Sequence, residues 1–196
     1  MLKFAIICLY DTLTKYMKNS QETPQNWAFH SILRRLKSMI KVLFICHGNI
    51  CRSPMAEFVM KDLVKREGLE DKFYIKSAAT HTDNIYNGVG DPVYPPARKK
   101  LAEHGISCAG KTARLITKKD KDDFDYLICM DSANVRNVTR VMGKDAETKI
   151  SMFLEYAGEH RDISDPWYTG DFEATWQDVK KSSEAFLQHL REQGLV

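Results

Sequence analysis

Apolar and polar residues follow two periods along this chain, and each period predicts one kind of element. Continuous apolar runs rich in β-branched and aromatic residues are typical of buried strands, whereas apolar residues three and four positions apart indicate amphipathic helices. Strands are predicted at residues 42–45, 73–75, 124–130 and 149–153. Helices are predicted at residues 54–67, 95–101, 131–141 and 171–193, and a short charged helix is expected to begin at residue 117. In the first helix, Met55 and Val59 are expected to face the core and Glu57 the solvent.

This order of elements predicts an α/β fold. Strands that alternate with helices form βαβ units and a parallel sheet. Ligands bind such open sheets beyond the carboxyl ends of the strands. Cys46, Ser77 and Asp131 each end or follow a predicted strand. We therefore expect these three residues to lie at the same edge of the sheet.

The strand at 42–45 leads directly into the motif Cys-His-Gly-Asn-Ile-Cys-Arg-Ser-Pro at residues 46–54. Ser53 is a good helix N-cap and Pro54 a good first helical residue, so residues 46–52 form a tight loop between a strand and a helix. Backbone N–H groups in such a loop point inward, and the helix N-terminus adds partial positive charge, which makes an anion site. Gly48 lets the backbone approach a ligand closely, and Asn49 tolerates positive φ.

The same loop carries a nucleophile and a cation. Arg52 can hold two oxygens of a phosphate-like dianion through its planar guanidinium group. Thiols at helix N-termini or beside cations ionise readily, so we expect Cys46 to react as a thiolate. Phosphoryl transfer to sulfur is the reaction that this combination favours. The alternative is a structural cysteine beside a surface arginine, and the context between a strand and a helix argues against it.

A phosphate ester also needs a proton for its leaving group, and Asp165 is the best candidate donor. Pro166 biases Asp165 toward an extended conformation. Trp167 and Tyr168 follow, and they can form the wall of a pocket for an aromatic ring. Asp-Pro is also a common turn signal. From the residues alone, a catalytic acid and a turn-starting aspartate therefore both remain open.

Composition narrows the possible functions. The chain has 196 residues, of which 43% are hydrophobic and 28% charged, and this suits one domain with a sizeable core. A net charge of +3 without basic clusters argues against nucleic acid as a partner. The 5 cysteines show no disulfide-scaffold spacing and predict a reducing, cytoplasmic location. Because the histidines and acidic residues lack metal-ligand spacing, we expect no metal and no other cofactor.

Residues 1–38 are expected to be an N-terminal extension outside the fold, with residues 39–196 forming the domain. The apolar run at 4–10 ends at Asp11 and is too short to span a bilayer, so no stable membrane insertion is expected. The alternative is a weak membrane-surface or partner anchor that uses this run and the basic stretch at 27–36.

The motif at 46–54 resembles the signature of the low-molecular-weight protein tyrosine phosphatases, and the resemblance extends from about Met39 to the C-terminus. It implies a single domain with a doubly wound, four-stranded parallel sheet in the strand order 2-1-3-4. It also implies a metal-independent reaction on phosphotyrosine-containing proteins, in a monomer or weak dimer. In that reaction Cys46 attacks phosphorus, Arg52 holds the oxygens, and Asp165 serves as general acid and then as general base.

The resemblance assigns supporting roles as well. It implies a substrate-binding set of His47, Gly48, Asn49, Ile50, Cys51, Ser53, Trp167 and Tyr168. It implies a hydrogen-bond network that holds the loop, formed by Asn49, Ser53, Ser77 and His104. Asp131 is expected to be structural, as a helix cap and a buttress of the loop. Cys51 is expected to form a reversible disulfide with Cys46, which protects the nucleophile from over-oxidation.

Two enzymes of the same fold remain as alternatives. Arsenate reductases share the loop but have Gln in place of Pro54, and they carry two further redox cysteines, whereas Cys108 and Cys129 lie in separate segments here. Protein-arginine phosphatases tend to have Thr at the position of Ile50. A non-catalytic phosphate-binding module is a third possibility, and the intact set of Cys46, Arg52 and Asp165 argues against it.

Two further segments bear on the site. The loop at 81–94 is expected to supply an aromatic wall, and Tyr86 is its candidate. Residues 105–112 fit the Walker A pattern. They follow a predicted helix rather than a strand, however, and we therefore predict no nucleotide site there.

Overall fold

The structure is a computed structural model that describes residues 39–196, so the predictions made for residues 1–38 lie outside the described residues. Within this range the main sheet has four parallel strands in the order β2-β1-β5-β6. They are β1 (Ile40–Cys46), β2 (Phe73–Ala79), β5 (Tyr126–Cys129) and β6 (Ile150–Met152). The predicted α/β fold and strand order are confirmed.

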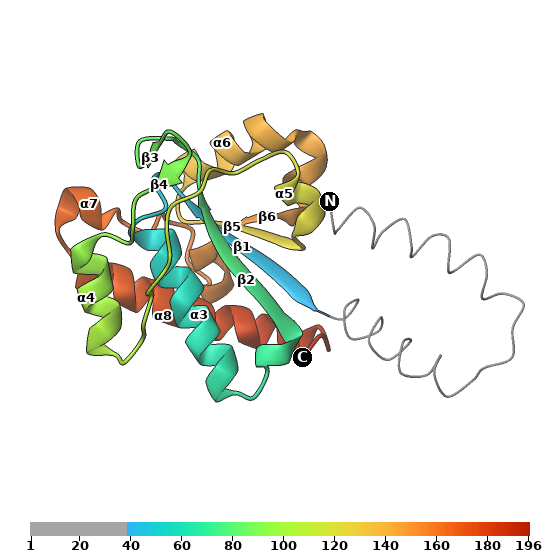
Figure 1. The fold of residues 1–196 in the computed structure, drawn as a ribbon. Helices are drawn as coiled ribbons and strands as arrows, with labels where there is room; N and C mark the ends of the chain where they lie inside the picture. Colours follow the sequence, from blue (N-terminus) through green and yellow to red (C-terminus); the bar gives the residue numbers. More distant parts are fainter. Residues whose placement is uncertain (1–38) are drawn as a thin grey trace, which may run out of the picture. The chain divides into compact units, whose positions relative to one another are not determined.

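Helices cover both faces of this sheet. They are α3 (Arg52–Arg66), α4 (Pro95–Glu103), α5 (Asp120–Asp123), α6 (Ser132–Met142), α7 (Pro166–Thr169) and α8 (Phe172–Glu192). In Figure 1, α3, α4 and α8 gather below the strands, and α5 and α6 lie above them. Alternation along β1 explains the two layers. Val42 and Phe44 pack into a core shared with α3 and α8, whereas Leu43 and Ile45 pack into another core with α6.

The central strand β1 is buried on both faces. Residues 42–45 have 0% of their surface exposed. Parallel strands that are covered by helices on both sides read as continuous apolar runs, which is the pattern seen here. Burying each such side chain contributes about 1.5–3 kcal/mol relative to an exposed position. The strand that ends in Cys46 is therefore firmly anchored.

Short elements differ from the predictions. The loop at 81–94 contains an antiparallel hairpin of β3 (Ile85–Tyr86) and β4 (Val89–Gly90), and the loop at 163–170 contains α7. Three 3₁₀-helices also occur among the described residues: η2 (Glu70–Lys72), η3 (Lys144–Lys149) and η4 (Phe153–Ala157). Strands of 2 residues and a helix of 4 residues are too short to show a hydrophobic period.

The start of α3 also differs. The prediction that Ser53 caps this helix is wrong, because α3 begins at Arg52 with Cys51 in the N-cap position and no side-chain cap. The Ser53 hydroxyl lies 3.0 Å from Cys46 Sγ and accepts a hydrogen bond from Asn49 Nδ2 at 2.9 Å. The hydroxyl is engaged by the loop and is not available to cap the helix.

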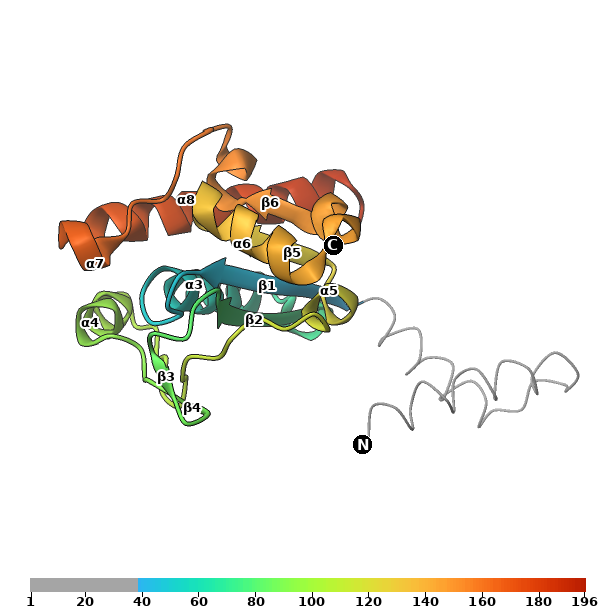
Figure 2. The same ribbon diagram turned by 90° about the horizontal axis from the view of Figure 1, so that it is seen from above.

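The strand register brings the ends of β1, β2 and β5 to the same edge of the sheet. Cys46 ends β1 there and Asp131 follows β5, whereas Ser77 lies within β2 opposite Phe44. Cys46 pairs with Ala79 on β2, and Ile45 pairs with Cys129 on β5. The chain segments that follow these strands leave the sheet side by side. Figure 2 shows α7 and the β3–β4 hairpin on either side of the edge where β1 ends. Residues from β1, from this hairpin and from α7 line the same pocket, which is the candidate site.

Candidate active site

The loop at 46–52 is held from outside through its backbone. The carbonyls of Cys46, His47 and Ile50 accept hydrogen bonds from the backbone N–H groups of Thr80, His81 and Tyr94, at 2.9, 3.1 and 2.9 Å. In a trans peptide the N–H points opposite to the carbonyl. With these carbonyls turned outward, the N–H groups that follow them face the interior of the loop. This is the arrangement that an anion site needs.

The Cys46 sulfur lies at the centre of this loop. The Asn49 N–H donates to Cys46 Sγ at 3.3 Å, and Ser53 Oγ lies 3.0 Å from it. Cys46 is only 3% exposed. The N-terminus of α3 begins at Arg52, and its partial positive charge also acts at this point. The sulfur is therefore surrounded by groups that interact favourably with an anion.

Asn49 fixes the shape of the loop. Its φ is +57°, in the left-handed region that asparagine tolerates better than most residues. Its Nδ2 donates to Ser53 Oγ at 2.9 Å and to Ser77 Oγ at 2.8 Å. Its Oδ1 accepts hydrogen bonds from Lys111 Nζ at 3.0 Å and from the Arg114 N–H at 3.1 Å. Every polar atom of this buried side chain has a partner.

The network beneath the loop also contains two charged residues, Lys111 and Glu57, which the sequence does not assign to it. Lys111 Nζ also donates to the Ser77 carbonyl at 3.2 Å and lies 3.6 Å from Glu57 Oε2. Ser77 Oγ donates to the same Glu57 oxygen at 2.6 Å. Burial lowers the pKa of Lys111 even though the Glu57 charge acts in the other direction. The prediction that Glu57 faces solvent is wrong, since it is 2% exposed.

The structure does not bring His104 to this network. Its ring stacks on Trp176 with the ring centres 3.8 Å apart, at the exposed end of α4. The network instead contains Lys111, which lies within the Walker-like segment at 105–112 and contacts Asn49 and Ser77. The hydrogen bonds of Lys111 to the loop give this segment a structural role.

Arg52 is buried between two carboxylates. Its Nη1 donates to Asp131 Oδ2 at 2.6 Å and to the Ile163 carbonyl at 3.2 Å, and its Nη2 donates to Asp165 Oδ2 at 2.5 Å. Burial alone would lower the pKa of Arg52, but the charges of Cys46, Asp165 and Asp131 outweigh it and the pKa is raised. The guanidinium group therefore stays charged and is held by these oxygens at the edge of the loop.

Asp131 and Asp165 each serve the local chain as well as Arg52. Asp131 Oδ1 caps α6 by accepting a hydrogen bond from the Asn134 N–H at 2.6 Å. Asp165 is the N-cap of α7, and its Oδ1 accepts a hydrogen bond from the Trp167 N–H at 3.1 Å. Asp165 therefore starts a turn of helix, and it also lines the pocket described below.

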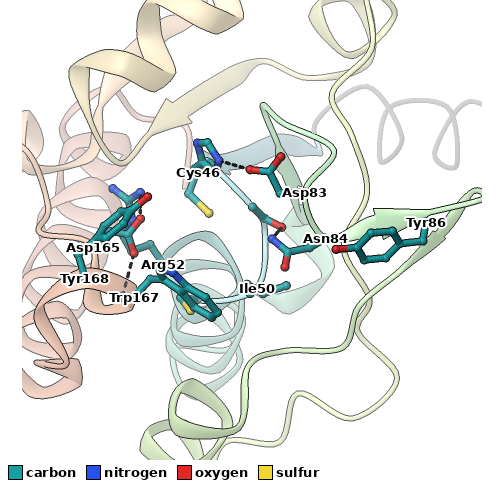
Figure 3. A pocket seen from close by; sticks show the side chains of 12 residues that line it. Cys46, Ile50, Arg52, Asp83, Asn84, Tyr86, Asp165, Trp167 and Tyr168 are labelled. Carbon is teal, nitrogen blue, oxygen red and sulfur yellow. Dashed lines mark hydrogen bonds and ion pairs between the residues drawn. The ribbon is translucent and has the colours of Figure 1, made fainter.

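These residues line a pocket of about 300 Å³, within the range typical of ligand sites. Its lining residues are Cys46, His47, Gly48, Ile50, Cys51, Arg52, Asp83, Asn84, Tyr86, Asp165, Trp167 and Tyr168. Figure 3 shows the Cys46 sulfur facing the space between Asp165 with Arg52 on one side and Asp83 with Asn84 on the other. Tyr86 lies on the hairpin side, where an aromatic wall is expected.

His47 connects the nucleophile to the hairpin side of the pocket. Its Nε2 lies 2.6 Å from Asp83 Oδ2, and its ring stacks on His81 with the centres 4.0 Å apart. The hydrogen bond to His47 lowers the pKa of Asp83. A Cβ atom on Gly48 would lie 2.3 Å from Asn84 Nδ2. Asp83 and Asn84 are lining residues that the sequence analysis missed, because their loop has no recognisable motif.

The four cysteines of the described range are free thiols. Cys51 lines the pocket beside Cys46, and burial, with the charges of Cys46 and Asp165, raises its pKa to about 12. Cys108 and Cys129 do not line this pocket and pack into different cores. Cys51, and neither of the other two, therefore lines the pocket together with the nucleophile.

None of the helices between residues 39 and 196 is long and apolar enough to cross a membrane. In the same range, no group of three or more His, Cys, Asp or Glu side chains is placed to hold a metal ion.

Comparison with known proteins places the chain in a family. The model of the low molecular weight phosphotyrosine protein phosphatases matches residues 41–195. A relative named low molecular weight protein-tyrosine-phosphatase YfkJ, from Bacillus subtilis, is 38% identical over 157 residues, which cover 79% of this chain and 98% of the relative. Its crystal structure matches with a TM-score of 0.75 over 79% of this chain and 96% of that chain.

Two more relatives extend the comparison. The low molecular weight phosphotyrosine protein phosphatase of Sus scrofa is 41% identical over 155 residues, which cover 76% of this chain and 95% of the relative. The crystal structure of a Drosophila arginine phosphatase matches with 32% identity and a TM-score of 0.67, over 76% of this chain and 97% of that chain. The fold, the loop and these matches agree: the chain belongs to the low molecular weight phosphotyrosine protein phosphatase family.

Proposed function

We propose that this chain hydrolyses phosphotyrosine in proteins through a phosphocysteine intermediate on Cys46. The observation that carries the proposal is the placement of Cys46 and Asp165 around Arg52 in the same pocket. A nucleophile, an anion-binding loop and a proton donor are the groups that this reaction requires.

In the first step, Cys46 Sγ attacks phosphorus in line with the tyrosyl oxygen. The S–P bond forms as the P–O bond breaks, and Asp165, as a carboxylic acid, gives its proton to the departing oxygen. Arg52 and the inward N–H groups of the loop hold the equatorial oxygens and stabilise their charge. Asp131 keeps Arg52 in place, because it accepts a hydrogen bond from the other guanidinium nitrogen.

In the second step, water attacks phosphorus and the S–P bond breaks. Asp165, now a carboxylate, accepts a proton from that water, and Cys46 leaves as a thiolate. Inorganic phosphate is released. Ser53 Oγ, at 3.0 Å from the sulfur, is placed to donate a hydrogen bond to the leaving thiolate. The cycle returns both catalytic residues to their starting states without a cofactor.

The pocket walls favour an aromatic leaving group. Ile50, Tyr86 and Trp167 line the pocket; Ile50 is buried, whereas Tyr86 and Trp167 are 65% and 55% exposed. These surfaces can pack against a phenyl ring. Ile50 also offers no acceptor for the N–H groups of a guanidino substrate, which argues against the arginine phosphatase alternative.

The test is hydrolysis of matched peptides that carry phosphotyrosine, phosphoserine or phosphoarginine, with and without the Cys46→Ser substitution. We expect turnover of the phosphotyrosine peptide alone, and its loss in the variant. Faster release from phosphoarginine would assign the alternative activity. Thioredoxin-dependent reduction of arsenate would assign the arsenate reductase activity. If the protein turns over none of these substrates, it is a phosphate-binding module and the proposal is contradicted.

We also propose where the catalytic domain begins and where the protein is located. The family match over residues 41–195 supports a catalytic domain at 39–196, with residues 1–38 as an extension to it. We place the protein in the cytoplasm, as a monomer or weak dimer. Deleting residues 1–38 is expected to leave phosphotyrosine hydrolysis intact, and its loss would contradict the domain boundary.

Reversible oxidation is the other proposal at this site. Cys46 and Cys51 line the same pocket, and peroxide would oxidise the two thiols to a disulfide with release of water. We expect a thiol reductant to restore activity in the wild type but not in the Cys51→Ser variant. Equal recovery in both proteins would exclude this role for Cys51.

A further inference from the structure

The segment at 159–165 carries Asp165 to the pocket without regular secondary structure of its own. On one side it is fastened to the end of β5 and the start of α6. The Ile163 N–H donates to the Met130 carbonyl at 2.9 Å, and the Ser132 N–H donates to Asp162 Oδ1 at 2.9 Å. These contacts fix the middle of the segment on one side, and α8 contacts it on the other.

On the other side, a row of polar residues on α8 contacts the segment. Thr175, Asp178 and Lys181 are spaced three apart and share one helical face. Thr175 Oγ1 donates to the Ser164 carbonyl at 3.3 Å. Lys181 Nζ donates to Glu159 Oε1 at 2.6 Å and lies 2.9 Å from Asp178 Oδ1.

The strongest contact in this row joins Arg161 to Asp178. Arg161 Nη1 and Nη2 donate to the two oxygens of Asp178 at 2.8 and 2.7 Å, a two-pronged geometry. Arg161 Nε also donates to Glu159 Oε2 at 2.8 Å. A network with this geometry contributes more than an isolated surface ion pair does.

Burial explains why this pair matters to the fold. Asp178 is only 7% exposed and Thr175 only 1% exposed, although both are polar. A buried carboxylate is costly without a partner. Burial raises the pKa of Asp178, but the hydrogen bonds from Arg161 and Lys181 outweigh it and the pKa is lowered. Asp178 is therefore an anion that is paired with Arg161 of the segment and with Lys181 of its own helix.

We propose that Arg161 and Asp178 are positioning residues, whose ion pair holds the 159–165 segment so that Asp165 reaches the oxygen of the leaving group. The inference rests on the function proposed above. Asp165 lies four residues beyond Arg161, and Arg52 and Thr175 hold the chain between them. Misplacing a catalytic group by about 1 Å can cost roughly 10²-fold in rate, so a loosened segment affects proton transfer first.

The test uses two substrates that differ in their need for a proton. Tyrosine is a poor leaving group, with a pKa of about 10, whereas p-nitrophenolate is a much weaker base and leaves without much assistance. In Arg161→Gln we expect kcat/KM to fall about tenfold for a phosphotyrosine peptide. For p-nitrophenyl phosphate the fall is less than about twofold. The Arg161 side chain is 48% exposed, so this substitution spares the packed core.

A matched control is available on the same helix. Arg191 forms an ion pair with Glu67 at 2.6 Å, and its side chain is 42% exposed. Arg191→Gln therefore removes a similar surface ion pair that has no contact with the acid segment. We expect it to leave kcat/KM for both substrates unchanged. Asp178→Asn is expected to reproduce the Arg161→Gln pattern, with folding checked by thermal unfolding.

A double substitution separates positioning from a general loss of structure. In the Asp165→Asn background no acid remains to be positioned, so adding Arg161→Gln is expected to cause no further loss. An equal loss on both substrates, or a full additional loss in this background, would overturn the inference. Failure of the wild type to hydrolyse phosphotyrosine would instead overturn the proposed function, so the two failures are distinguishable.

Discussion

The two halves of the site are built in different ways. The phosphate-binding loop at 46–52 is one continuous stretch between β1 and α3, and its nucleophile and cation are six residues apart. The acid segment at 159–165 is held by residues distant in sequence. Arg52 and Asp165 are separated by 113 positions and Arg161 and Asp178 by 17. A motif encodes the first half, whereas tertiary packing assembles the second.

This difference has a functional consequence. Every phosphate ester must use the loop, because phosphorus and its oxygens sit there in both steps. In the first step, which kcat/KM reports, only esters with a basic leaving group depend strongly on the acid. Substitutions in the loop should therefore lower activity toward all substrates alike, and substitutions in the acid segment should separate substrates by leaving group.

The largest effect is expected from Cys46→Ser. Without the thiol, turnover of every substrate should fall by at least about 10³-fold. Binding should survive, because the loop N–H groups and Arg52 remain. Calorimetric titration with an unhydrolysed phosphotyrosine peptide checks this, and loss of binding along with turnover would show that the loop itself had collapsed.

Asp165→Asn comes next and tests the other half of the site. We expect kcat/KM for a phosphotyrosine peptide to fall by about 10²–10⁴-fold, the usual contribution of a general acid. The loss for p-nitrophenyl phosphate should be much smaller. A plot of log kcat/KM against the pKa of the leaving group should be steeper for the variant than for the wild type. An unchanged slope would show that Asp165 is not the general acid.

Asn49→Ala has a smaller effect that does not depend on the leaving group. The substitution removes hydrogen bonds to Ser53 and Ser77 and leaves alanine at a φ of +57°, where a non-glycine residue is strained by about 1–2 kcal/mol. We expect kcat/KM to fall about tenfold or more for both substrates. Asn87, at a φ of +51° in the hairpin turn, is the matched control. Asn87→Ala should lower stability without this loss of activity.

The smallest effect concerns stability and pH. Because the folded protein lowers the pKa of Asp178 below its ordinary 3.8, ionised Asp178 stabilises the fold above that value and loses its contribution as the pH falls through the folded-state pKa. Asp178→Asn should cost about 1 kcal/mol in the free energy of unfolding at pH 7. Urea unfolding at falling pH should show the two proteins converging, and a constant difference would contradict this assignment.

The same contrast explains what the sequence could predict. The strands and the strand order follow from apolar runs and from the resemblance of one contiguous motif. The helical pattern predicts an exposed Glu57, because glutamates on helices usually face solvent, and only its contacts with Ser77 and Lys111 reveal that it is buried. The Arg161–Asp178 pair has no local signal, since ion pairs between a loop and a helix leave no period in the sequence.

The measurement that tests the central claim most directly is identification of the covalent intermediate. A peptide with radiolabelled phosphotyrosine is mixed with the protein, the reaction is stopped by rapid denaturation, and the labelled protein fragment is mapped. The account predicts label on Cys46 in the wild type and no label in Cys46→Ser. Label on the adjacent His47, or turnover with no covalent intermediate, would contradict it.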